Sequence, residues 1–556
     1  MCSMIPFCIL LRISLVLVYW FSSVLLSNLL KRKAEGYFPK EKNLAEEFDL
    51  VHQAIFTDSD DQSGWFYHLW LLEQTITKDT PWLNSSWPAS DSELIISASK
   101  SASGCMVLSS ARYSTNGGTI PVILYFNQSV RGLNSSTVAV RSALAESKDI
   151  IWRPLSVDKY ESAQAWVALL NFSDVPLDYS IAYPVEVRVG DSSEIISLSG
   201  SSLSHVFEFK FVVRFQQLDS GEAEGQNLEG ILWEDSNFKK YEMNSWESNL
   251  FSLFNQLQID ADQAGVDCKW KVNMLANEIE LFRELSAADC KIGKLTLARL
   301  LTALDTIVSE SSTLNSSQMV HTEEVLALYC DLMKMDPPHS QYYKEEHSMA
   351  LLRQVTCCKN SLSRYCWRYG KIAKTNNDSF ICVRLNSLSL SRIGSIENLL
   401  WVQMLDLSQN ELGSLEGNAP KLKFLLLKGL EAMQLLSCLN LSNNKIKSLT
   451  ALDPLRHLKL LKVLDISHNE IGEHSIDSTR YLCSSPLSHT VANDWKLSLS
   501  SGDVDQLTKY WEAYIIFRDL TLTQLEITGN AIVDEDFRSF LRKILSTLQW
   551  LDGTIL

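Results

Sequence analysis

The chain has 556 residues and a formal net charge of −16. This acidic balance argues against a nucleic-acid backbone as the partner, because the chain offers no basic stripe to phosphates. With 46% hydrophobic and 21% charged residues, the composition is that of ordinary globular material. A prior of roughly 100–200 residues per domain predicts about three or four domains.

An apolar run without charged residues covers positions 13–30. Its length just suffices for a membrane-spanning helix. Lys31, Arg32 and Lys33 follow the run, and by the positive-inside rule they would place the remaining chain in the cytoplasm. A secretory signal would carry its positive charge before the run. The N-x-S/T sequons in this Ser-rich sequence are short enough to arise by chance, so we expect a cytoplasmic protein.

The next part of the chain is predicted to be helical. Across positions 46–56, apolar residues and His52 recur at spacings of three and four, which is typical of one helix face; we place Phe48, Val51, Ile55 and Phe56 on that face. The small acidic residues of positions 57–64 predict a turn that caps a second helix. Together the two helices would form a hairpin.

The second helix begins near Ser63 in the stretch DQSGWFYHLWLL, which is dense in aromatic residues. We expect His68 to be a buried, hydrogen-bonded histidine rather than a catalytic base. Asp58, Asp60 and Asp61, with Glu47, offer a possible cation site. A turn that caps a helix uses the same residues, and we favour that reading.

After the hairpin, the sequence changes to short β-rich runs separated by Ser, Gly, Asn and Pro. This pattern predicts an antiparallel β-sandwich, without the paired cysteines of an extracellular immunoglobulin domain, because Cys105 stands alone in it. The acidic positions 216–235 read as a linker, and helical periodicity returns at 270–285, 295–307 and 323–335. The β-rich runs lie at 122–126, 138–140, 150–152, 165–169, 185–189 and 206–211.

From position 382 onward an L-x-L-x-x-N frame recurs, with a weaker first copy beginning at Val383. It is the frame of a leucine-rich repeat, in which each copy supplies a strand and its asparagine bonds the backbone at the following turn. Two copies of the frame are separated from the preceding copy by unusually long stretches of sequence. These stretches predict an inserted segment near 473–517 and a looped-out segment near 418–429. The structural asparagines of the frame are Asn410, Asn444, Asn469 and Asn530.

Motifs that carry chemistry are missing from the sequence: there is no P-loop, no HExxH, no G-x-S-x-G and no GxGxxG after a strand. The 12 cysteines include no CxxC pair. Cys357, Cys358 and Cys366 lie close together without a histidine at ligand spacing, so we expect buried or free thiols there. We predict no catalytic residue and no metal ligand on this chain.

The hairpin resembles a repeat of the protein prenyltransferase alpha subunit family. Each repeat of that family is a helical hairpin whose second helix opens with a tryptophan and an aromatic/His-Arg-Trp run. Trp65, His68 and Trp70 match this signature, whereas Leu69 stands where many repeats have arginine. By this resemblance, the residues put forward for partner binding are Asp61, Gln62, Trp65, Tyr67, His68 and Trp70.

The order of the parts is similar to that of one branch of the family, the alpha subunits of Rab geranylgeranyltransferases. The resemblance implies a multidomain α+β fold in which the chain keeps one hairpin and the tail of another, so we expect an N-terminal truncation. The expected parts are an unmatched apolar segment (1–22), a remnant of α-α helical-hairpin repeats (23–85), an inserted immunoglobulin-like antiparallel β-sandwich (95–215), a helical segment (240–360) and a C-terminal leucine-rich repeat domain (380–556).

The resemblance also implies a function. Enzymes of this branch are heterodimers that transfer geranylgeranyl from geranylgeranyl diphosphate to C-terminal cysteines of Rab GTPases, which a Rab escort protein presents. The catalytic zinc belongs to the beta subunit, where it turns the thiol into a thiolate nucleophile, so no cofactor is expected on this chain. The alternatives are a non-catalytic leucine-rich repeat scaffold and a membrane-anchored binding protein with the same sandwich and repeats.

Overall fold

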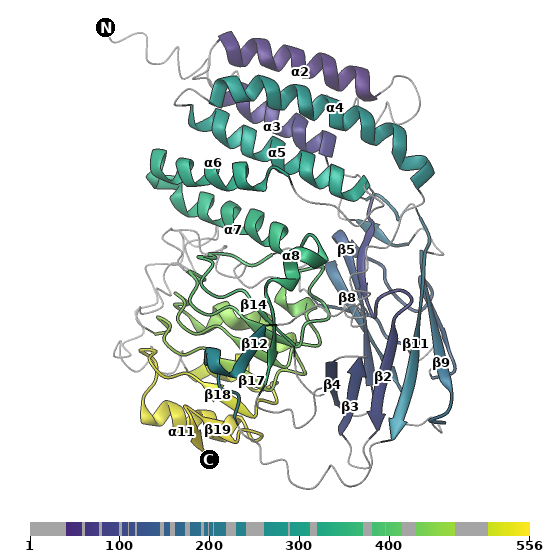
Figure 1. The fold of residues 1–556 in the computed structure, drawn as a ribbon, viewed down its shortest axis with the longest axis vertical. Helices are drawn as coiled ribbons and strands as arrows, with labels where there is room; N and C mark the ends of the chain where they lie inside the picture. Colours follow the sequence, from purple (N-terminus) through teal and green to yellow (C-terminus); the bar gives the residue numbers. More distant parts are fainter. Residues whose placement is uncertain are drawn as a thin grey trace, which may run out of the picture. The chain divides into compact units, whose positions relative to one another are not determined.

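A computed structural model gives the fold of the chain (Figure 1), and the labels of helices and strands below follow that figure. The chain divides into two compact units, one of residues 1–78 and 259–337, the other of residues 79–258 and 338–556. The residues that the structure describes are 40–57, 62–76, 80–98, 103–108, 111–116, 119–144, 150–155, 162–172, 178–190, 194–197, 200–203, 205–217, 230–240, 261–286, 290–311, 320–370, 381–394, 396–413, 429–472 and 510–556.

The first unit is a stack of helices. The helix pairs with the most extensive contacts are α4 with α5, α5 with α6, α2 with α3 and α3 with α5 (Figure 1). The hairpin near the start of the chain is therefore completed by helices that follow the β-sandwich in sequence. Their bounds are Lys40–Thr57 (α2), Gln62–Ile76 (α3), Ala261–Ser286 (α4), Lys291–Ser311 (α5) and Thr322–Met335 (α6).

The periodicity of α2 is largely that expected from the sequence. Phe48, Val51 and Ile55 are buried, as the predicted face requires. The prediction that Phe56 lies on the same face is wrong, because this residue is 53% exposed. The residue next to Ile55 lies about 100° further around the helix, which turns it away from α3.

Two β-sheets begin the second unit, and their inner faces share a hydrophobic core. The first sheet has the order β1-β5-β8-β7, with β10 also pairing β5, and the second has the order β4-β3-β2-β11-β9-β6. The first sheet consists of Leu83–Trp87 (β1), Thr119–Arg131 (β5), Arg153–Pro154 (β7), Ala163–Asn171 (β8) and Ile196–Ser197 (β10). The second consists of Glu93–Ala98 (β2), Ser103–Leu108 (β3), Ala111–Asn116 (β4), Val138–Ser142 (β6), Ala182–Val189 (β9) and Phe207–Gln217 (β11).

The sandwich differs from the predicted one in three respects. Strand β1 begins at Leu83, ahead of the expected start and inside the range expected to be helical. The pair β2–β11 is parallel, whereas the prediction was purely antiparallel. Positions 150–152 are not a strand: Ile150 and Trp152 are buried, but the ladder starts at Arg153. A short apolar run indicates that its residues are buried, but a buried residue need not belong to a hydrogen-bonded β-strand.

The leucine-rich repeats of the second unit form a parallel sheet in the order β14-β15-β16-β17-β18-β19, with antiparallel strands added at both edges. Strand β15 pairs directly with β16, and β17 with β18. The two long sequence gaps thus add no strand to the ladder between these pairs. Most of both gaps, positions 414–428 and 473–509, lies outside the described residues.

The strands of this repeat sheet are short, and helices connect some of them. The strands are Phe238–Lys240 (β12), Cys366–Tyr369 (β13), Ile381–Arg384 (β14), Met404–Asp406 (β15), Cys438–Asn440 (β16), Val463–Asp465 (β17), Gln524–Glu526 (β18), Trp550–Leu551 (β19) and Thr554–Ile555 (β20). The helices of the unit are Asp235–Asn237 (η2), Ser340–Thr356 (α7), Lys359–Ser363 (α8), Leu430–Ala432 (η6), Leu449–His457 (η7) and Glu535–Ile544 (α11), and η4 (Pro337–His339) lies at the boundary of the units.

Helix α7 lies in the predicted helical range 240–360, beyond the last stretch of predicted helical periodicity at 323–335. That range also contains positions 241–260, which lie outside the described residues, as does the apolar run at positions 13–30. Within the described part of the chain, no helix combines the length and apolarity that crossing a membrane requires.

Candidate functional site

The hairpin that carried the family resemblance is held together by close helix packing. Gly64 near the start of α3 faces Ile55 of α2: a Cβ atom at this glycine would lie 3.2 Å from Cγ1 of Ile55. Glycine therefore permits the close approach of the two helices. The turn between them includes Asp58, Asp60 and Asp61, which lie outside the described residues, so the cation site considered there stays a prediction.

Trp65 and His68, both put forward for partner binding, are packed inside the helical unit. Their exposed fractions are 2% and 0%. The ring of Trp65 lies 5.8 Å from that of Phe282 on α4, and the ring of His68 lies 4.7 Å from the same phenylalanine. These two residues of the motif are therefore packing residues of this chain.

Tyr67 and Trp70 lie on a less buried side of α3. Their rings are stacked, with centroids 5.7 Å apart and planes inclined by 13°. The hydroxyl of Tyr67 donates a hydrogen bond of 2.8 Å to Glu47 of α2. Of the residues put forward for partner binding, Tyr67 and Trp70 are the ones whose half-buried rings remain within reach of a partner; the side chain of Gln62 lies outside the described part.

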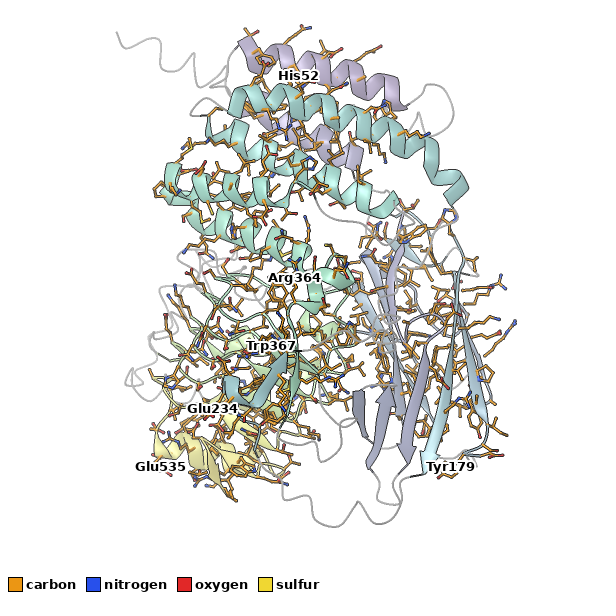
Figure 2. The ribbon with its side chains drawn as sticks, in the orientation of Figure 1. His52, Tyr179, Glu234, Arg364, Trp367 and Glu535 are labelled. Atoms are coloured by element: carbon orange, nitrogen blue, oxygen red, sulfur yellow. The ribbon has the colours of Figure 1, made fainter. Side chains whose placement is uncertain are left out.

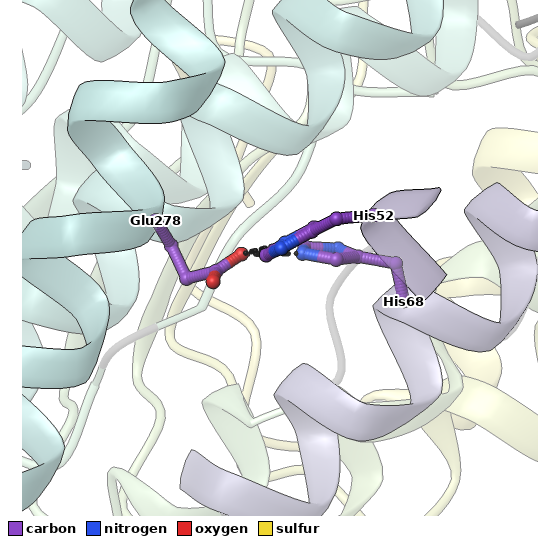
Figure 3. Close-up of side chains that lie close together, drawn as sticks. All are labelled: His52, His68 and Glu278. Atoms are coloured by element: carbon purple, nitrogen blue, oxygen red, sulfur yellow. Dashed lines mark hydrogen bonds and ion pairs between the residues drawn. The ribbon is translucent and has the colours of Figure 1, made fainter. Parts of the chain in front are cut away.

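His52, His68 and Glu278 form a compact cluster of polar side chains in the helical unit (Figure 3). Oε2 of Glu278 lies 2.9 Å from Nε2 of His52 and 2.8 Å from Nε2 of His68. The three residues come from α2, α3 and α4, so one carboxylate joins three helices. We call them the His-His-Glu cluster.

Each of the three helices supplies the cluster with one polar residue and one aromatic neighbour a helical turn away. Phe48 precedes His52 on α2, Trp65 precedes His68 on α3, and Phe282 follows Glu278 on α4. The rings of Phe48 and His68 lie 5.3 Å apart, and those of His52 and Phe282 lie 6.1 Å apart. The aromatic rings surround the polar atoms and limit the access of water.

The electrostatics of the cluster follow from this burial. Burial acts to raise the pKa of Glu278, but hydrogen bonds from His52 and His68 outweigh it and leave the pKa below its usual value. Burial lowers the pKa of His68, and the bond to Glu278 opposes this only in part. The arrangement therefore favours an ionised carboxylate beside a neutral His68 imidazole. Nδ1 of His68 has no hydrogen-bond partner among the described residues.

Sequence reasoning identified both histidines but missed Glu278, which lies 210 residues beyond His68. A local signal did exist. Leu275, Ile279 and Phe282 of α4 are buried, and a glutamate on the same stripe of a helix occupies a core position. Buried carboxylates require a partner that hydrogen-bonds to them or balances their charge. The position of Glu278 therefore predicts that such a partner exists, but it does not predict which residue it is.

The four structural asparagines form a ladder through the repeat domain. Nδ2 of Asn444 donates to the carbonyl oxygens of Leu407 and Leu441, both at 3.0 Å, while its Oδ1 accepts from the amide of Leu412 at 3.1 Å. The residue before each asparagine has a positive φ, from 52° to 76°. Corresponding bonds to the backbone are made by Asn410, Asn469 and Asn530.

One face of the repeat sheet, which leucine-rich repeats often use for binding, is covered by part of this chain. Gln524 of β18 holds the backbone of Ile231: its Oε1 accepts from the amide at 2.7 Å, and its Nε2 donates to the carbonyl at 2.9 Å. Ile231 belongs to the expected linker, yet it is buried against Met404 and Cys438. The covering segment is residues 230–240, which include the labelled Glu234 (Figure 2).

An arginine anchors the covering segment further along the sheet. Arg384 of β14 pairs with Asp235 at 2.7 Å and with Asp406 at 3.0 Å. Its guanidinium carbon lies 4.6 Å from the ring centroid of Phe238 and 5.6 Å from that of Trp367. Hydrogen bonds, apolar burial and ion pairs thus all hold the segment on the sheet.

Comparison with known proteins places this geometry in context. No family model matches the chain. A protein of Arabidopsis thaliana named geranylgeranyl transferase type-2 subunit alpha 1 is 45% identical over 540 residues, which cover 96% of this chain and 72% of that protein. A second Arabidopsis thaliana protein, named geranylgeranyl transferase type-2 subunit alpha 2, is 42% identical over 549 residues and covers 96% of this chain and 71% of its own length. Among solved structures, a leucine-rich repeat protein of Leptospira interrogans is 19% identical with a TM-score of 0.17, covering 29% of this chain and 28% of its own.

Proposed function

Because the chain belongs to the family of geranylgeranyl transferase type-2 alpha subunits, we propose that it works as the alpha subunit of a heterodimeric Rab geranylgeranyltransferase. The observation that carries this proposal is the similarity across 96% of the chain at 45% identity. The word subunit in the relatives' names implies a partner subunit. The chain accordingly has a role in a transferase complex, with a beta subunit as its partner.

The finer assignments complete the proposal. The beta subunit holds the catalytic zinc, which lowers the pKa of the substrate thiol and makes it a nucleophile. The lipid donor is geranylgeranyl diphosphate, and the acceptors are C-terminal cysteines of Rab GTPases delivered by a Rab escort protein. This chain supports the reaction as the structural and regulatory subunit, in the cytoplasm. The cysteines whose side chains the structure describes are free thiols, in keeping with a reducing compartment; they are Cys290, Cys330, Cys357, Cys358, Cys366, Cys382 and Cys438.

A reconstitution experiment tests the proposal. The full chain is co-expressed with a geranylgeranyl transferase type-2 beta subunit, and the purified complex receives geranylgeranyl diphosphate, an escort protein and a Rab GTPase. We expect co-purification in equal amounts and lipid transfer that depends on both subunits. Recovery of the chain alone, with no transfer after the beta subunit is added, would overturn the proposal and favour the non-catalytic scaffold.

The stacked pair Tyr67 and Trp70 is the proposed contact of this chain with a protein of the complex. Aromatic rings that remain accessible at the surface are frequent anchors of protein interfaces. We expect Trp70→Ala to weaken capture of the beta subunit or the escort protein by on the order of tenfold. Trp511→Ala is the matched control, because Trp511 is stacked on Tyr514 with centroids 5.7 Å apart in the other unit. Equal affinities of the two variants would exclude the pair as a contact.

A further inference from the structure

The His-His-Glu cluster brings three potential metal ligands to one point. Nε2 of His52, Nε2 of His68 and an oxygen of Glu278 all lie within 4.8 Å of one another. From this convergence we propose that the cluster binds a divalent transition-metal ion, with Zn²⁺ as the best match. The site is separate from the catalytic zinc assigned to the beta subunit, and it departs from our expectation that this chain carries no metal ligand.

The distances suit such an ion. Ligand bonds of about 2.0–2.1 Å in a tetrahedral zinc site place neighbouring ligand atoms about 3.3 Å apart. The observed separations of Glu278 Oε2 from the two Nε2 atoms are 2.9 and 2.8 Å. Movements of a few tenths of an ångström would open room for the ion. The side chains already point at one another from three helices (Figure 3), so little ordering is left for the ion to impose.

The donor set selects the kind of ion. Two imidazole nitrogens and one carboxylate oxygen form a three-ligand set found at zinc sites, with a fourth position left for water. Imidazole also suits copper and nickel, whereas calcium and magnesium prefer sites made of oxygen. A magnesium or calcium site would need more carboxylates or carbonyls than the cluster provides.

Burial and access also fit a bound cation. The side chains of His68 and Glu278 are 0% and 7% exposed, whereas that of His52 is 16% exposed. A buried carboxylate is costly unless a cation or hydrogen bonds compensate its charge. The ion would supply that charge, and His52 lies on the side from which it could enter. Beyond the one water ligand, the aromatic rings of Phe48 and Phe282 limit the access of bulk water to the site.

Such an ion would cross-link helices that are far apart in the sequence. It would tie α2 and α3, which precede the sandwich in sequence, to α4, which follows it. Because ions bind the folded site and not the unfolded chain, metal binding adds to the stability of the folded state. The expected consequence is a helical unit that is more stable with zinc than without it.

Metal titration of the full chain without a beta subunit tests the proposal, so that no second zinc site contributes. The protein is treated with a chelator, dialysed, and titrated with ZnCl₂ or CoCl₂. We expect about one tightly bound equivalent, a visible cobalt spectrum of tetrahedral type, and a rise of the melting temperature by roughly 5 °C at 100 times the dissociation constant. Absence of a bound equivalent at saturating zinc would overturn the proposal.

Two variants and one control separate metal binding from simple hydrogen bonding. Glu278→Gln keeps an oxygen that accepts from both histidines but removes the charge, and His52→Ala removes the more accessible ligand. We expect both to lose the bound equivalent and the cobalt spectrum. The control is His321→Ala in the same unit, where Nδ1 of His321 lies 2.8 Å from Asp305. Zinc binding by Glu278→Gln as tight as that of the unsubstituted chain would show that the cluster is only a hydrogen-bonded one.

Discussion

Asp465 is a buried carboxylate in the middle of the repeat sheet. Its Oδ1 accepts hydrogen bonds from the amide of Ser467 at 3.0 Å and from its hydroxyl at 2.7 Å. Burial raises the pKa of Asp465, the bonds from Ser467 oppose this, and the nearby charge of Asp406 adds to the rise. In the neighbouring strand the paired residue is Asn440, whose Oδ1 accepts from the amide of Ser442 at 2.9 Å without carrying a charge.

We therefore expect Asp465→Asn to stabilise the protein by about 1 kcal/mol at pH 7, because it keeps the acceptor and removes a buried charge. A carboxyl whose pKa is raised on folding stabilises the fold at pH values below the pKa of the unfolded state, which is 3.8 for aspartate. That contribution is lost as the pH rises through the folded pKa. The variant should lose this pH dependence.

Denaturant unfolding between pH 4 and pH 7 measures this effect. The control is Asp453→Asn, which removes a more exposed carboxylate paired with Arg456 at 2.9 Å, and we expect its free energy of unfolding to change by less than about 1 kcal/mol. A lower stability of Asp465→Asn at pH 7, or an unchanged pH profile, would contradict the interpretation of Asp465.

At the scale of elements, the covering segment of residues 230–240 behaves as an added part of the repeat sheet. It contributes the edge strand β12, which pairs with β13. Ile231 is 8% exposed, whereas its neighbour Leu232 is 44% exposed. The two adjacent aliphatic residues thus differ mainly in whether they face the sheet.

We expect Ile231→Asp to detach the covering segment, because the substitution places an unpaired charge against apolar residues of the sheet. Hydrogen exchange of residues 230–240 should accelerate by at least about tenfold, and proteolysis there should become faster. Leu232→Asp, the matched control, should leave the exchange nearly unchanged. Similar exchange rates in the two variants would show that burial of Ile231 does not hold the segment.

At the scale of the whole molecule, the sandwich and the repeat domain form one unit. Residues of both contribute to one continuous core. The hydroxyl of Ser85 in β1 donates to the carbonyl of Glu397 between the repeat strands at 3.0 Å. Glu397 is half-buried, and this burial raises the pKa of its carboxyl. The helices α2 to α6 belong to the other unit.

We accordingly expect the sandwich and the repeat domain to unfold together. Leu94→Ala, in a fully buried position of β2, should cost about 2–5 kcal/mol. It should accelerate hydrogen exchange of the repeat strands β15 to β17 as well as that of the sandwich. Leu275→Ala in α4 is equally buried and should leave the repeat strands unaffected. Exchange that changes in the sandwich alone would contradict a common unit.

The elements with strong periodicity could be predicted from the sequence. The spacing around Phe48 indicated α2, and the L-x-L-x-x-N frame indicated the strands that carry Asn410 and its counterparts. Elements with a weaker pattern could not be predicted, because β2, β3 and β4 have no long apolar run. The apolar run around Ile150 predicted a strand, although its buried residues form none. Helix spacing predicts which face is buried, but it does not predict what covers that face.

The sequence by itself determined the local periods, the repeat frame and the family to which the hairpin points, because these depend on residues a few positions apart. Only the tertiary structure decided that Glu278 meets His52 and His68, that the expected linker covers the repeat sheet, and that Trp65 is packed within the chain. The physical reason is that these contacts join residues separated by more than 200 positions. They are selected by packing and by the need to pair buried polar groups, and neither leaves a period in the sequence.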